Sequence, residues 1–245
     1  MISMVILNWA RPNSIQKIVP HYCEMPIITD IIIFNNNPNV DLCELDLKYS
    51  KLSIIQSSRD LGLYSRYATA ALAKEEVVLF VDDDLVVDES SISALLREQQ
   101  KDKRRCYGLF GRRVAKKYTR VNIFGSVNII LTRCLLTSKS NCISALHLIP
   151  HFAHLEGVPK GNGEDIILSY VPLIRFGTAN KAFPLPYTEL LDDNGVPQDQ
   201  NSSQAIHRRS TSHITHRESV IAICENLRFR RNFMRLKRIF LTDGK

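Results

Sequence analysis

The chain has 245 residues, of which 44% are hydrophobic and 23% are charged, and its formal net charge is +7. This length suits one α/β domain, and the balance of apolar and charged residues is that of a folded globular protein. No apolar run approaches the roughly 20 residues of a membrane span, and no secretory leader is recognisable. The positive charge favours polyanionic partners such as nucleotide diphosphates, acidic membranes or nucleic acids, without selecting among them.

The cysteines are spread along the chain without any CxxC pair. They are Cys23, Cys43, Cys106, Cys134, Cys142 and Cys224. This spacing predicts reduced thiols, most of them in the core of a cytoplasmic protein, and argues against a zinc site.

The first half of the chain alternates between short apolar runs and helical patterns. Residues 3–7, 30–34, 52–56 and 77–81 are rich in β-branched residues and are predicted to be buried strands. Helices are expected over about residues 14–19, through an alanine-rich stretch ending at residue 73, and from a capping segment at 88–91 to about residue 100. The alternation predicts a mostly parallel, doubly wound sheet, although no GxGxxG follows the first strand.

The second half is less regular. Strand-like runs occur at residues 106–110 and 127–131, and residues 150–163 have the composition of an irregular loop. Glu164 and Asp165 then open an apolar helix, either as stabilising first-turn acids or as carboxylates at the floor of a cleft. Residues 192–204 are rich in turn formers. From His207 onward the chain is basic and helical, which favours either an amphipathic helix that touches acidic lipid or a solvated tail.

Three carboxylates, Asp82, Asp83 and Asp84, follow the strand at residues 77–81. In an extended chain, Asp82 and Asp84 would point to one side and Asp83 to the other. Open α/β sheets bind ligands at the carboxyl ends of their strands, and adjacent carboxylates repel each other unless a cation or hydrogen-bond donors offset the repulsion. Such oxygen ligands suit Mg²⁺ or Mn²⁺, which could also hold a diphosphate, whereas the alternative is a solvated acidic turn.

Several segments together resemble the GT-A glycosyltransferases, and most closely the exostosin-like family of retaining N-acetylhexosaminyltransferases. The resemblance spans about residues 3–227 and follows the order of landmarks in that family. These are the first strand with its loop carrying Arg11, IIIFNNNP, the helix start at Arg66, VVLFVDDDLVV, GLFGRRV, SVNIILTRCLL, GEDIILSYV and HRRSTSHITHRESV. Each landmark alone is a weak signal, and their shared order favours the family.

The resemblance implies an α/β fold of GT-A type, with a Rossmann-like, mostly parallel central sheet flanked by helices and a smaller antiparallel portion in the second half. It implies a single domain over residues 1–245, with a nucleotide-binding half at about 1–100, an acceptor and catalytic half at 101–227, and a basic tail at 228–245. The expected reaction is metal-dependent transfer of a sugar, an N-acetylhexosamine, from a UDP-sugar to a saccharide or lipid-linked acceptor with retention of configuration. The expected location is the cytoplasm, with membrane contact through the basic tail and no nucleic-acid partner.

The resemblance also assigns roles to residues. Asp84, with Asp82, would bind Mn²⁺ or Mg²⁺, while Asp82 and Asp83 would bind ribose or metal-bound water. Asp165 would face the anomeric carbon, and Arg217 would contact the diphosphate. The uridine and ribose would be held by Trp9, Arg11, Asn35 and Arg66, and Arg217 would be helped by Arg208 and His213. Because a lone histidine is more often structural than catalytic, His213 and His216 carry little weight.

Four alternatives stay open. Glu164 stands where the family has an aspartate, and Gly-Glu-Asp also occurs in inverting GT-A enzymes, in which Asp165 would take the proton of the acceptor. A nucleotidyltransferase that builds the activated sugar would need a glycine-rich phosphate loop, and NWARPNS has no glycine. A non-catalytic nucleic-acid-binding protein using the basic C-terminus would leave the acidic strand end unexplained. A GT-A-like binding module without catalysis is the fourth reading.

Overall fold

The computed structural model describes residues 1–114, 118–119, 121–155, 162–192, 194–198 and 212–242. Its main feature is a sheet of eight strands in the order β3-β2-β1-β4-β10-β6-β11-β8. In chain order the strands are β1 (Ile2–Asn8), β2 (Ile28–Asn35), β3 (Leu52–Gln56), β4 (Val77–Asp82), β6 (Tyr107–Gly108), β8 (Gly125–Val127), β10 (Cys134–Ser138) and β11 (Asn180–Ala182).

Neighbouring strands are parallel from β3 to β4, whereas β10 runs antiparallel to both β4 and β6. Beyond them, β11 is parallel to β6 and antiparallel to β8. This arrangement confirms the mostly parallel sheet with a smaller antiparallel portion in the second half. Two short pairs lie outside the sheet, β5 (Leu85–Val86) with β12 (Thr188–Glu189), and β7 (Gly111–Arg112) with β9 (Ile129–Ile130).

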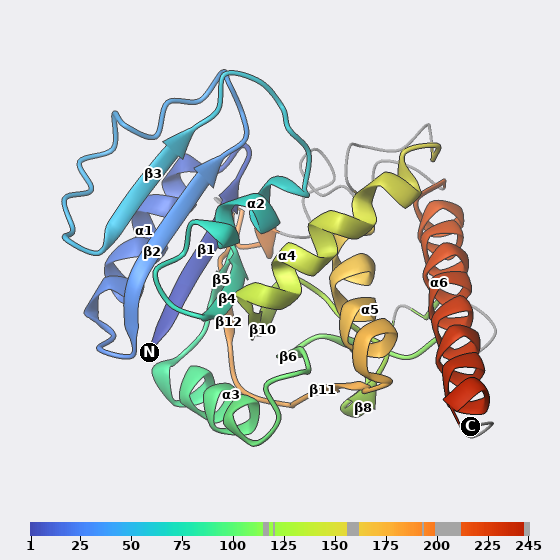
Figure 1. The fold of residues 1–245 in the computed structure, drawn as a ribbon. Helices are drawn as coiled ribbons and strands as arrows, with labels where there is room; N and C mark the ends of the chain where they lie inside the picture. The colour runs from blue at the N-terminus through green and yellow to red at the C-terminus, as the bar shows by residue number, and fades with distance from the viewer. Residues whose placement is uncertain (115–117, 120, 156–161, 193, 199–211, 243–245) are drawn as a thin grey trace.

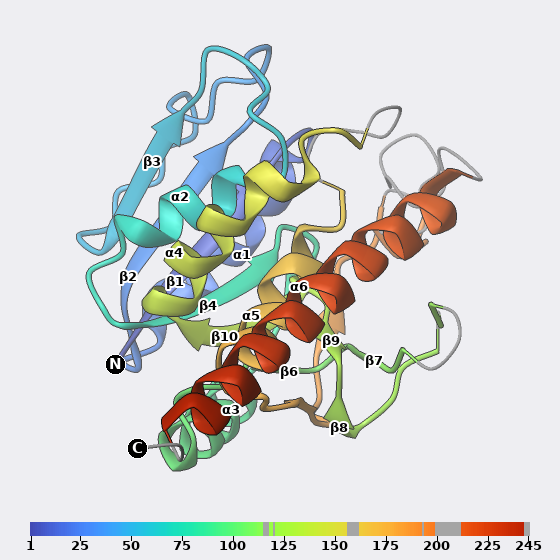
Figure 2. The same cartoon turned by 45° about the vertical axis from the view of Figure 1, so that its right-hand side comes forward.

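Helices cover both faces of the sheet, as Figures 1 and 2 show. The helices α1 (Pro12–Glu24) and α3 (Glu89–Lys101) share one apolar core with the sheet residues Ile6, Ile33 and Val81. The helices α2 (Ser65–Ala71), α4 (Lys139–Leu148) and α5 (Glu164–Phe176) contribute to the core that contains Val5 and Phe80. The strands are apolar on both sides because each face meets a helix layer. A short 3₁₀ helix, η1 (Ile149–Phe152), follows α4.

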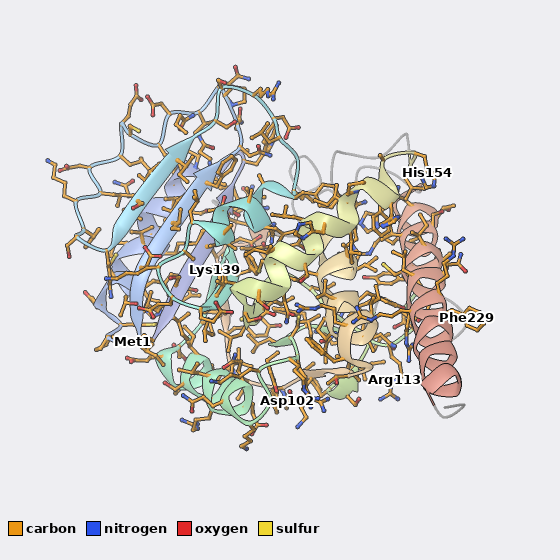
Figure 3. The ribbon with its side chains drawn as sticks, in the orientation of Figure 1. Met1, Asp102, Arg113, Lys139, His154 and Phe229 are labelled. Atoms are coloured by element: carbon orange, nitrogen blue, oxygen red, sulfur yellow. The ribbon has the colours of Figure 1, made fainter. Side chains whose placement is uncertain are left out.

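The last helix, α6 (Ser212–Thr242), lies outside α5 and contributes Val220 to the same core. Its Phe229 side chain points away from the protein and is 71% exposed, as Figure 3 shows. Arg230 and Arg231 beside it are also exposed. Among the helices that the structure describes, none has the length and hydropathy that a membrane span requires. The contact of this basic segment with an acidic membrane stays a prediction.

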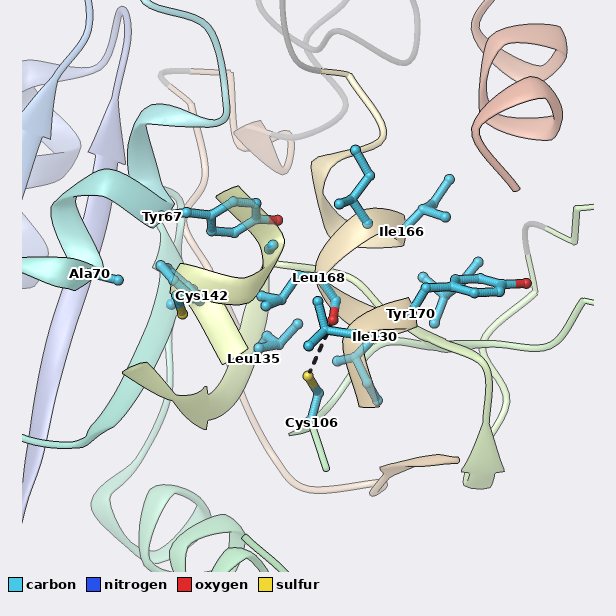
Figure 4. Packing of buried hydrophobic residues seen from close by; sticks show 14 of the residues in the cluster. Tyr67, Ala70, Cys106, Ile130, Leu135, Cys142, Ile166, Leu168 and Tyr170 are labelled. Carbon is cyan, nitrogen blue, oxygen red and sulfur yellow. Dashed lines mark hydrogen bonds between the residues drawn. The ribbon is translucent and has the colours of Figure 1, made fainter. Parts of the chain in front are cut away.

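Cysteines contribute to the core that contains Val5 and Phe80. Figure 4 shows Tyr67 of α2, Cys142 of α4 and Leu168 of α5 in the core between these helices and the sheet, where Cys106 Sγ lies 4.0 Å from the Leu168 carbonyl oxygen. All six cysteines are unpaired, and four of them are buried. The prediction of reduced, mostly buried thiols is therefore met, apart from the half-buried Cys23 and the exposed Cys43.

Two strand predictions in the second half were right in position but too long. Only residues Tyr107–Gly108 of the run 106–110 form a strand. The run 127–131 is divided at Asn128 between β8 and β9, which belong to different sheets. The Asn128 amide donates to the Arg112 carbonyl oxygen, and its Oδ1 accepts from the Val114 amide. These bonds hold Asn128 at the point where the backbone leaves the main sheet at β8 and enters the short pair of β9 with β7.

The three helices predicted in the first half are present, but the ends of two of them differ from the prediction. The helix expected at 14–19 extends over Pro12–Glu24 and contains Pro20, while the one expected to reach residue 73 ends at Ala71. The segment at 88–91 does begin a helix, but Asp88 makes no side-chain capping hydrogen bond. Helix α4 was not predicted, and of the loop expected at 150–163 the first residues belong to η1, while residues 156–161 lie outside the described part.

Candidate active site

Four strand ends bring polar side chains to one edge of the sheet. In the pairing register, Asn8 of β1 lies beside Asn35 of β2, which lies beside Gln56 of β3, while Asp82 of β4 lies beside Leu7. Because these strands are parallel, their carboxyl ends meet at the same edge, where open α/β sheets place their ligands. The three aspartates predicted as the centre of the site therefore lie at the expected position.

The three aspartates do not alternate as expected. The strand ends at Asp82, and Asp83 and Asp84 form a turn before β5. In this turn both side chains reach the same guanidinium: Arg11 Nη1 donates to Asp83 Oδ1 at 2.8 Å and to Asp84 Oδ2 at 2.7 Å. The prediction that Asp83 points away from Asp84 was wrong, because side-chain alternation holds only for extended backbone.

Arg11 is held in place by neighbours on three segments. Its backbone amide donates to Asn8 Oδ1 at 3.3 Å, and its Nη2 donates to the carbonyl oxygen of Gln198 at 3.1 Å. The side chain of Gln198 in turn accepts a hydrogen bond from Ser14 Oγ at 2.8 Å. Gln198 was not predicted as a site residue, and a single glutamine in a polar loop gives no sequence signal for this contact.

Burial and like charges raise the pKa of Asp83. Loss of solvation is the main cause, Asp84 and Asp82 add to it, and Arg11 opposes it, so the pKa rises to about 7. Burial lowers the pKa of Arg11, but Asp83 and Asp84 more than compensate, so its net pKa is raised. The acidic turn therefore carries fewer full negative charges near neutral pH than its three carboxyl groups suggest.

A second arginine lies between the acidic turn and helix α5. Arg66, in the first turn of α2, is 6% exposed, with Nη1 3.5 Å from Asp82 Oδ1 and Nη2 3.9 Å from Glu164 Oε1. Its Nε is buried without a hydrogen-bond partner among the described residues. Burial lowers the pKa of Arg66, but Glu164 and Asp82 outweigh it and the net pKa is raised. Arg66 was predicted to hold the nucleotide, and that role stays a prediction.

From the sequence, Glu164 was expected to be either a stabilising acid at a helix start or a carboxylate at the floor of a cleft, and no role in the reaction was assigned to it. It is 5% exposed, and its Oε1 accepts a hydrogen bond from Thr132 Oγ1 at 3.0 Å. Burial and the neighbouring Asp165 raise its pKa to about 7, against the opposing effect of Arg66 and Arg217. Its contact with Thr132 joins residues 32 positions apart, for which the local sequence gives no signal.

Asp165 and Arg217 form a buried ion pair between α5 and α6. Arg217 Nη2 lies 2.5 Å from Asp165 Oδ2, and both side chains are almost fully buried. The other oxygen, Oδ1, accepts from the Ile166 amide at 2.9 Å. The guanidinium of Arg217 also stacks on Tyr118, 4.6 Å from the ring centroid. Burial lowers the pKa of Arg217, but Asp165 and Tyr118 raise it further, so the net direction is upward.

The remaining predicted residues differ in how accessible they are. Trp9 follows β1 and is 40% exposed, so its ring is available to a ligand. Asn35 is fully buried: it accepts from Asn8 Nδ2 at 2.8 Å and donates to Gln56 Oε1 at 2.9 Å. These contacts join the carboxyl ends of β1, β2 and β3, and the nucleotide contact of Asn35 stays a prediction.

The basic residues near the start of α6 are only partly described. His213 lies four residues before Arg217 in α6, so the two share a face of the helix. His216 Nε2 lies 2.8 Å from the carbonyl oxygen of Asn162. Arg208, predicted to help bind the diphosphate, lies outside the described residues.

The acidic turn fits a divalent ion through the chemistry of its donors. Within the described ranges, no group of three or more His, Cys, Asp or Glu side chains is arranged to hold a metal ion. Mg²⁺-type sites in nucleotide enzymes commonly use one or two carboxylates and complete the shell with phosphates and water. Asp82, whose side chain is 36% exposed, and Asp84 would be such a pair of oxygen ligands.

The site as a whole has an excess of carboxyl groups over guanidinium groups. The acids are Asp82, Asp83, Asp84, Glu164 and Asp165, and the arginines that contact them are Arg11, Arg66 and Arg217. If all were ionised, one divalent cation would neutralise the difference. The arrangement is therefore suited to bind a divalent cation.

Comparison with known proteins finds a matching protein family and solved structures with a similar fold. The model of the "Glycosyl transferase family 64 domain" matches residues 2–223. Among the curated proteins searched, none matches the chain. The crystal structure of GalNAc-T7 with UDP, GalNAc and Mn²⁺ is similar at a TM-score of 0.55 and 15% identity, over 81% of this chain and 44% of that chain.

The mannosyltransferase PcManGT from Pyrobaculum calidifontis, in complex with GDP-Man and Mn²⁺, is also similar at a TM-score of 0.55. Its identity is 12%, and the match covers 92% of this chain and 69% of that chain. At these identities the likeness shows the fold alone, which is the GT-A fold of both glycosyltransferases. The chain spans 44% of the length of the GalNAc-T7 chain.

Proposed function

The chain belongs to the glycosyl transferase family 64 domain family and is a glycosyltransferase, and we propose that it transfers an N-acetylhexosamine from a UDP-sugar to a saccharide or lipid-linked acceptor. We propose further that it is of the exostosin-like type, that it retains the anomeric configuration, and that it needs Mn²⁺ or Mg²⁺. The observation that carries this proposal is the position of the Asp165–Arg217 pair, which Arg66 and Glu164 connect to the acidic turn at the end of β4.

Asp82 and Asp84 would hold the metal ion, which when bound would supply positive charge to the leaving diphosphate. Two features support this assignment. Both residues lie at the carboxyl edge of the parallel strands, and Asp82 keeps a partly exposed carboxylate. Mn²⁺ is also present in the complexes of both similar structures. Asp83, which is buried against Arg11, would act by fixing the turn.

The donor nucleotide would lie over the ends of β1 and β2. The half-exposed ring of Trp9 offers a stacking face for a base, a contact of about 1–3 kcal/mol in nucleotide-binding proteins. Arg11 follows Trp9 by two residues and bonds to the acidic turn, so its guanidinium would meet the ribose or the diphosphate when a nucleotide binds. Arg217 and His213, from one face of α6, would contribute positive charge near the diphosphate.

Retention is supported by the bonds that Asp165 makes. In an inverting enzyme this carboxylate would take a proton from the acceptor and would have to lie open to it, whereas the Asp165 side chain is 5% exposed. Here Oδ2 is engaged by Arg217 and Oδ1 by the Ile166 amide. A carboxylate held in this way is better suited to orient the acceptor and to stabilise positive charge that develops on the sugar ring.

The proposal is tested by incubating the protein and Mn²⁺ with a series of UDP-sugars and GDP-mannose, together with saccharide and lipid-linked acceptors, and measuring nucleotide release. We expect release from a UDP-N-acetylhexosamine, its loss in chelator, and its loss in Asp165→Asn, with Asp102→Asn as the control for a carboxylate paired with arginine outside the site. Nuclear magnetic resonance of the product would show the donor's α configuration. Turnover of GDP-mannose alone would overturn the donor assignment, and a β product would overturn retention.

A further inference from the structure

Arg66 is the one described side chain that contacts both acidic parts of the site. Its Nη1 lies 3.5 Å from Asp82 Oδ1, and its Nη2 lies 3.9 Å from Glu164 Oε1. Both distances exceed the roughly 2.9 Å of a direct N–H to oxygen hydrogen bond. The guanidinium is therefore shared between the two carboxylates, with one long hydrogen bond to Asp82 and a longer ion pair to Glu164.

The two carboxylates are held with unequal firmness. The Glu164 side chain is 7% exposed and its Oε1 is fixed by the hydroxyl of Thr132 at 3.0 Å. The Asp82 side chain is 36% exposed, and Arg66 is its ion-pair partner among the described residues. The Arg66 guanidinium is attracted by both the Asp82 and the Glu164 carboxylates. Loss of the Glu164 charge therefore alters the position of Arg66 relative to Asp82.

We propose that Glu164 is a positioning residue for the metal site, which holds Arg66 back from Asp82 and so leaves the Asp82 carboxylate available to a divalent ion. The inference rests on the proposed function, because it takes the acidic turn as the metal site. Without the negative charge of Glu164, Arg66 would move toward Asp82 and shorten the ion pair that it makes there at 3.5 Å. A divalent ion would then have to displace this guanidinium to use the Asp82 oxygens.

Glu164, which is not itself a metal ligand, would therefore control the affinity of the site for a divalent ion through Arg66. Two simpler readings predict other results. If Glu164 only stabilises the start of α5, its loss lowers the stability of the fold and leaves metal affinity unchanged. If Glu164 acts by its charge alone, its loss weakens metal binding to the same extent whether or not Arg66 is present.

The test is the dissociation constant of Mn²⁺ alone, measured by electron paramagnetic resonance of the free ion with the whole chain and no nucleotide. Glu164→Gln should weaken Mn²⁺ binding about 10-fold, the lower end of what changes around metal ligands typically cost. In an Arg66→Met background the same Glu164→Gln change should have an effect of less than about 2-fold. Glu225→Gln, which removes a carboxylate from the remote pair with Arg228, is the matched control and should leave the constant unchanged.

Thr132→Val keeps every charge and removes the hydrogen bond that fixes Glu164. It should weaken Mn²⁺ binding in the same direction by about 3-fold, and it decides the question if Arg66→Met does not fold. Unchanged affinity in Glu164→Gln, an equal loss with and without Arg66, or unchanged affinity in Thr132→Val would each overturn the inference. Failure of the wild-type protein to bind Mn²⁺ both alone and with UDP would instead overturn the proposed metal site itself. That result is distinguishable because it is obtained without any variant.

Discussion

Arg217 and Asp165 lie 52 residues apart in the sequence, and their side chains meet at 2.5 Å between Nη2 and Oδ2 in the interior of the protein. The pair joins the first turn of α5 to the first part of α6 and holds the carboxylate at the site in one orientation. A buried ion pair of this kind adds little folding stability compared with an apolar pair. Removing one partner is nevertheless strongly destabilising, because the other charge is then buried without a counter-charge.

The first prediction concerns that pair. Arg217→Met leaves Asp165 buried without its partner and should lower the free energy of unfolding by about 3–5 kcal/mol, measured by urea denaturation. Arg228→Met is the matched control, because the pair of Arg228 with Glu225 is 3.4 Å apart and partly exposed; it should cost less than about 1 kcal/mol. Adding Asp165→Leu to Arg217→Met should restore part of the stability. Equal stability of Arg217→Met and wild type would contradict the buried pair.

The second prediction compares the two glycines that flank α5. Gly163 has φ of +92° and Gly177 has φ of +69°, so alanine at either position should cost about 1–2 kcal/mol through left-handed backbone strain. A Cβ at Gly163 would also lie 3.1 Å from Val220 Cγ2 of α6, whereas one at Gly177 meets nothing within 4 Å. Since Val220 lies one turn from Arg217, only Gly163→Ala should disturb the Asp165–Arg217 geometry.

This comparison is measured as thermal stability and nucleotide release on the same preparations. Both alanine variants should unfold at lower temperature than wild type, and Gly163→Ala should lose more. Gly177→Ala should keep its activity at temperatures where it is folded. Equal activity of the two variants would show that the approach of α6 to the start of α5 does not matter for the reaction.

The third prediction concerns pH. The pKa of Asp83 is raised to about 7, above its unfolded value of about 3.9, so between these values the folded state holds a proton that the unfolded state has released. Its contribution to stability is therefore present below about pH 4 and is lost as pH rises to about 7, by at most about 4 kcal/mol. Asp83→Asn should flatten the fall of stability with pH over this window.

Asp102 supplies a control of opposite sign. Hydrogen bonds from Arg104 lower the pKa of Asp102, so this residue contributes stability that is lost as pH falls. Asp102→Asn should consequently remove stability mainly below about pH 4 and leave the decline between pH 4 and 7 nearly unchanged, while Asp83→Asn makes that decline shallower. The measurement is urea denaturation of the three proteins at several pH values, and parallel curves for wild type and Asp83→Asn would contradict the raised pKa.

Local sequence patterns were sufficient to locate the acidic turn. The apolar run before Asp82 forms a strand buried on both sides, and the acids follow it at the carboxyl edge of the sheet. The start of α5 at Glu164 was also correctly placed, because acids after Gly163 mark a helix N-terminus. In both cases the residues that determine the structure are adjacent in the chain.

Contacts between distant segments could not be predicted in this way. Gln198 meets Arg11 across 187 residues, and Thr132 meets Glu164 across 32. Such pairs depend on how the sheet brings its loops together, and a polar residue in a loop has no pattern that names its partner. Even the directions of Asp83 and Asp84 followed from the turn that ends β4, for which the strand period gave the wrong answer.

The central claim is that the acidic turn binds a nucleotide diphosphate together with a divalent ion. Isothermal titration calorimetry of UDP, with and without Mn²⁺, on the wild-type protein and on Asp84→Ala tests it most directly, with circular dichroism to confirm that the variant is folded. We predict that wild type binds UDP only when Mn²⁺ is present and that folded Asp84→Ala does not bind it. UDP binding of equal affinity without Mn²⁺ or in Asp84→Ala, or no UDP binding by wild type under either condition, would contradict the account.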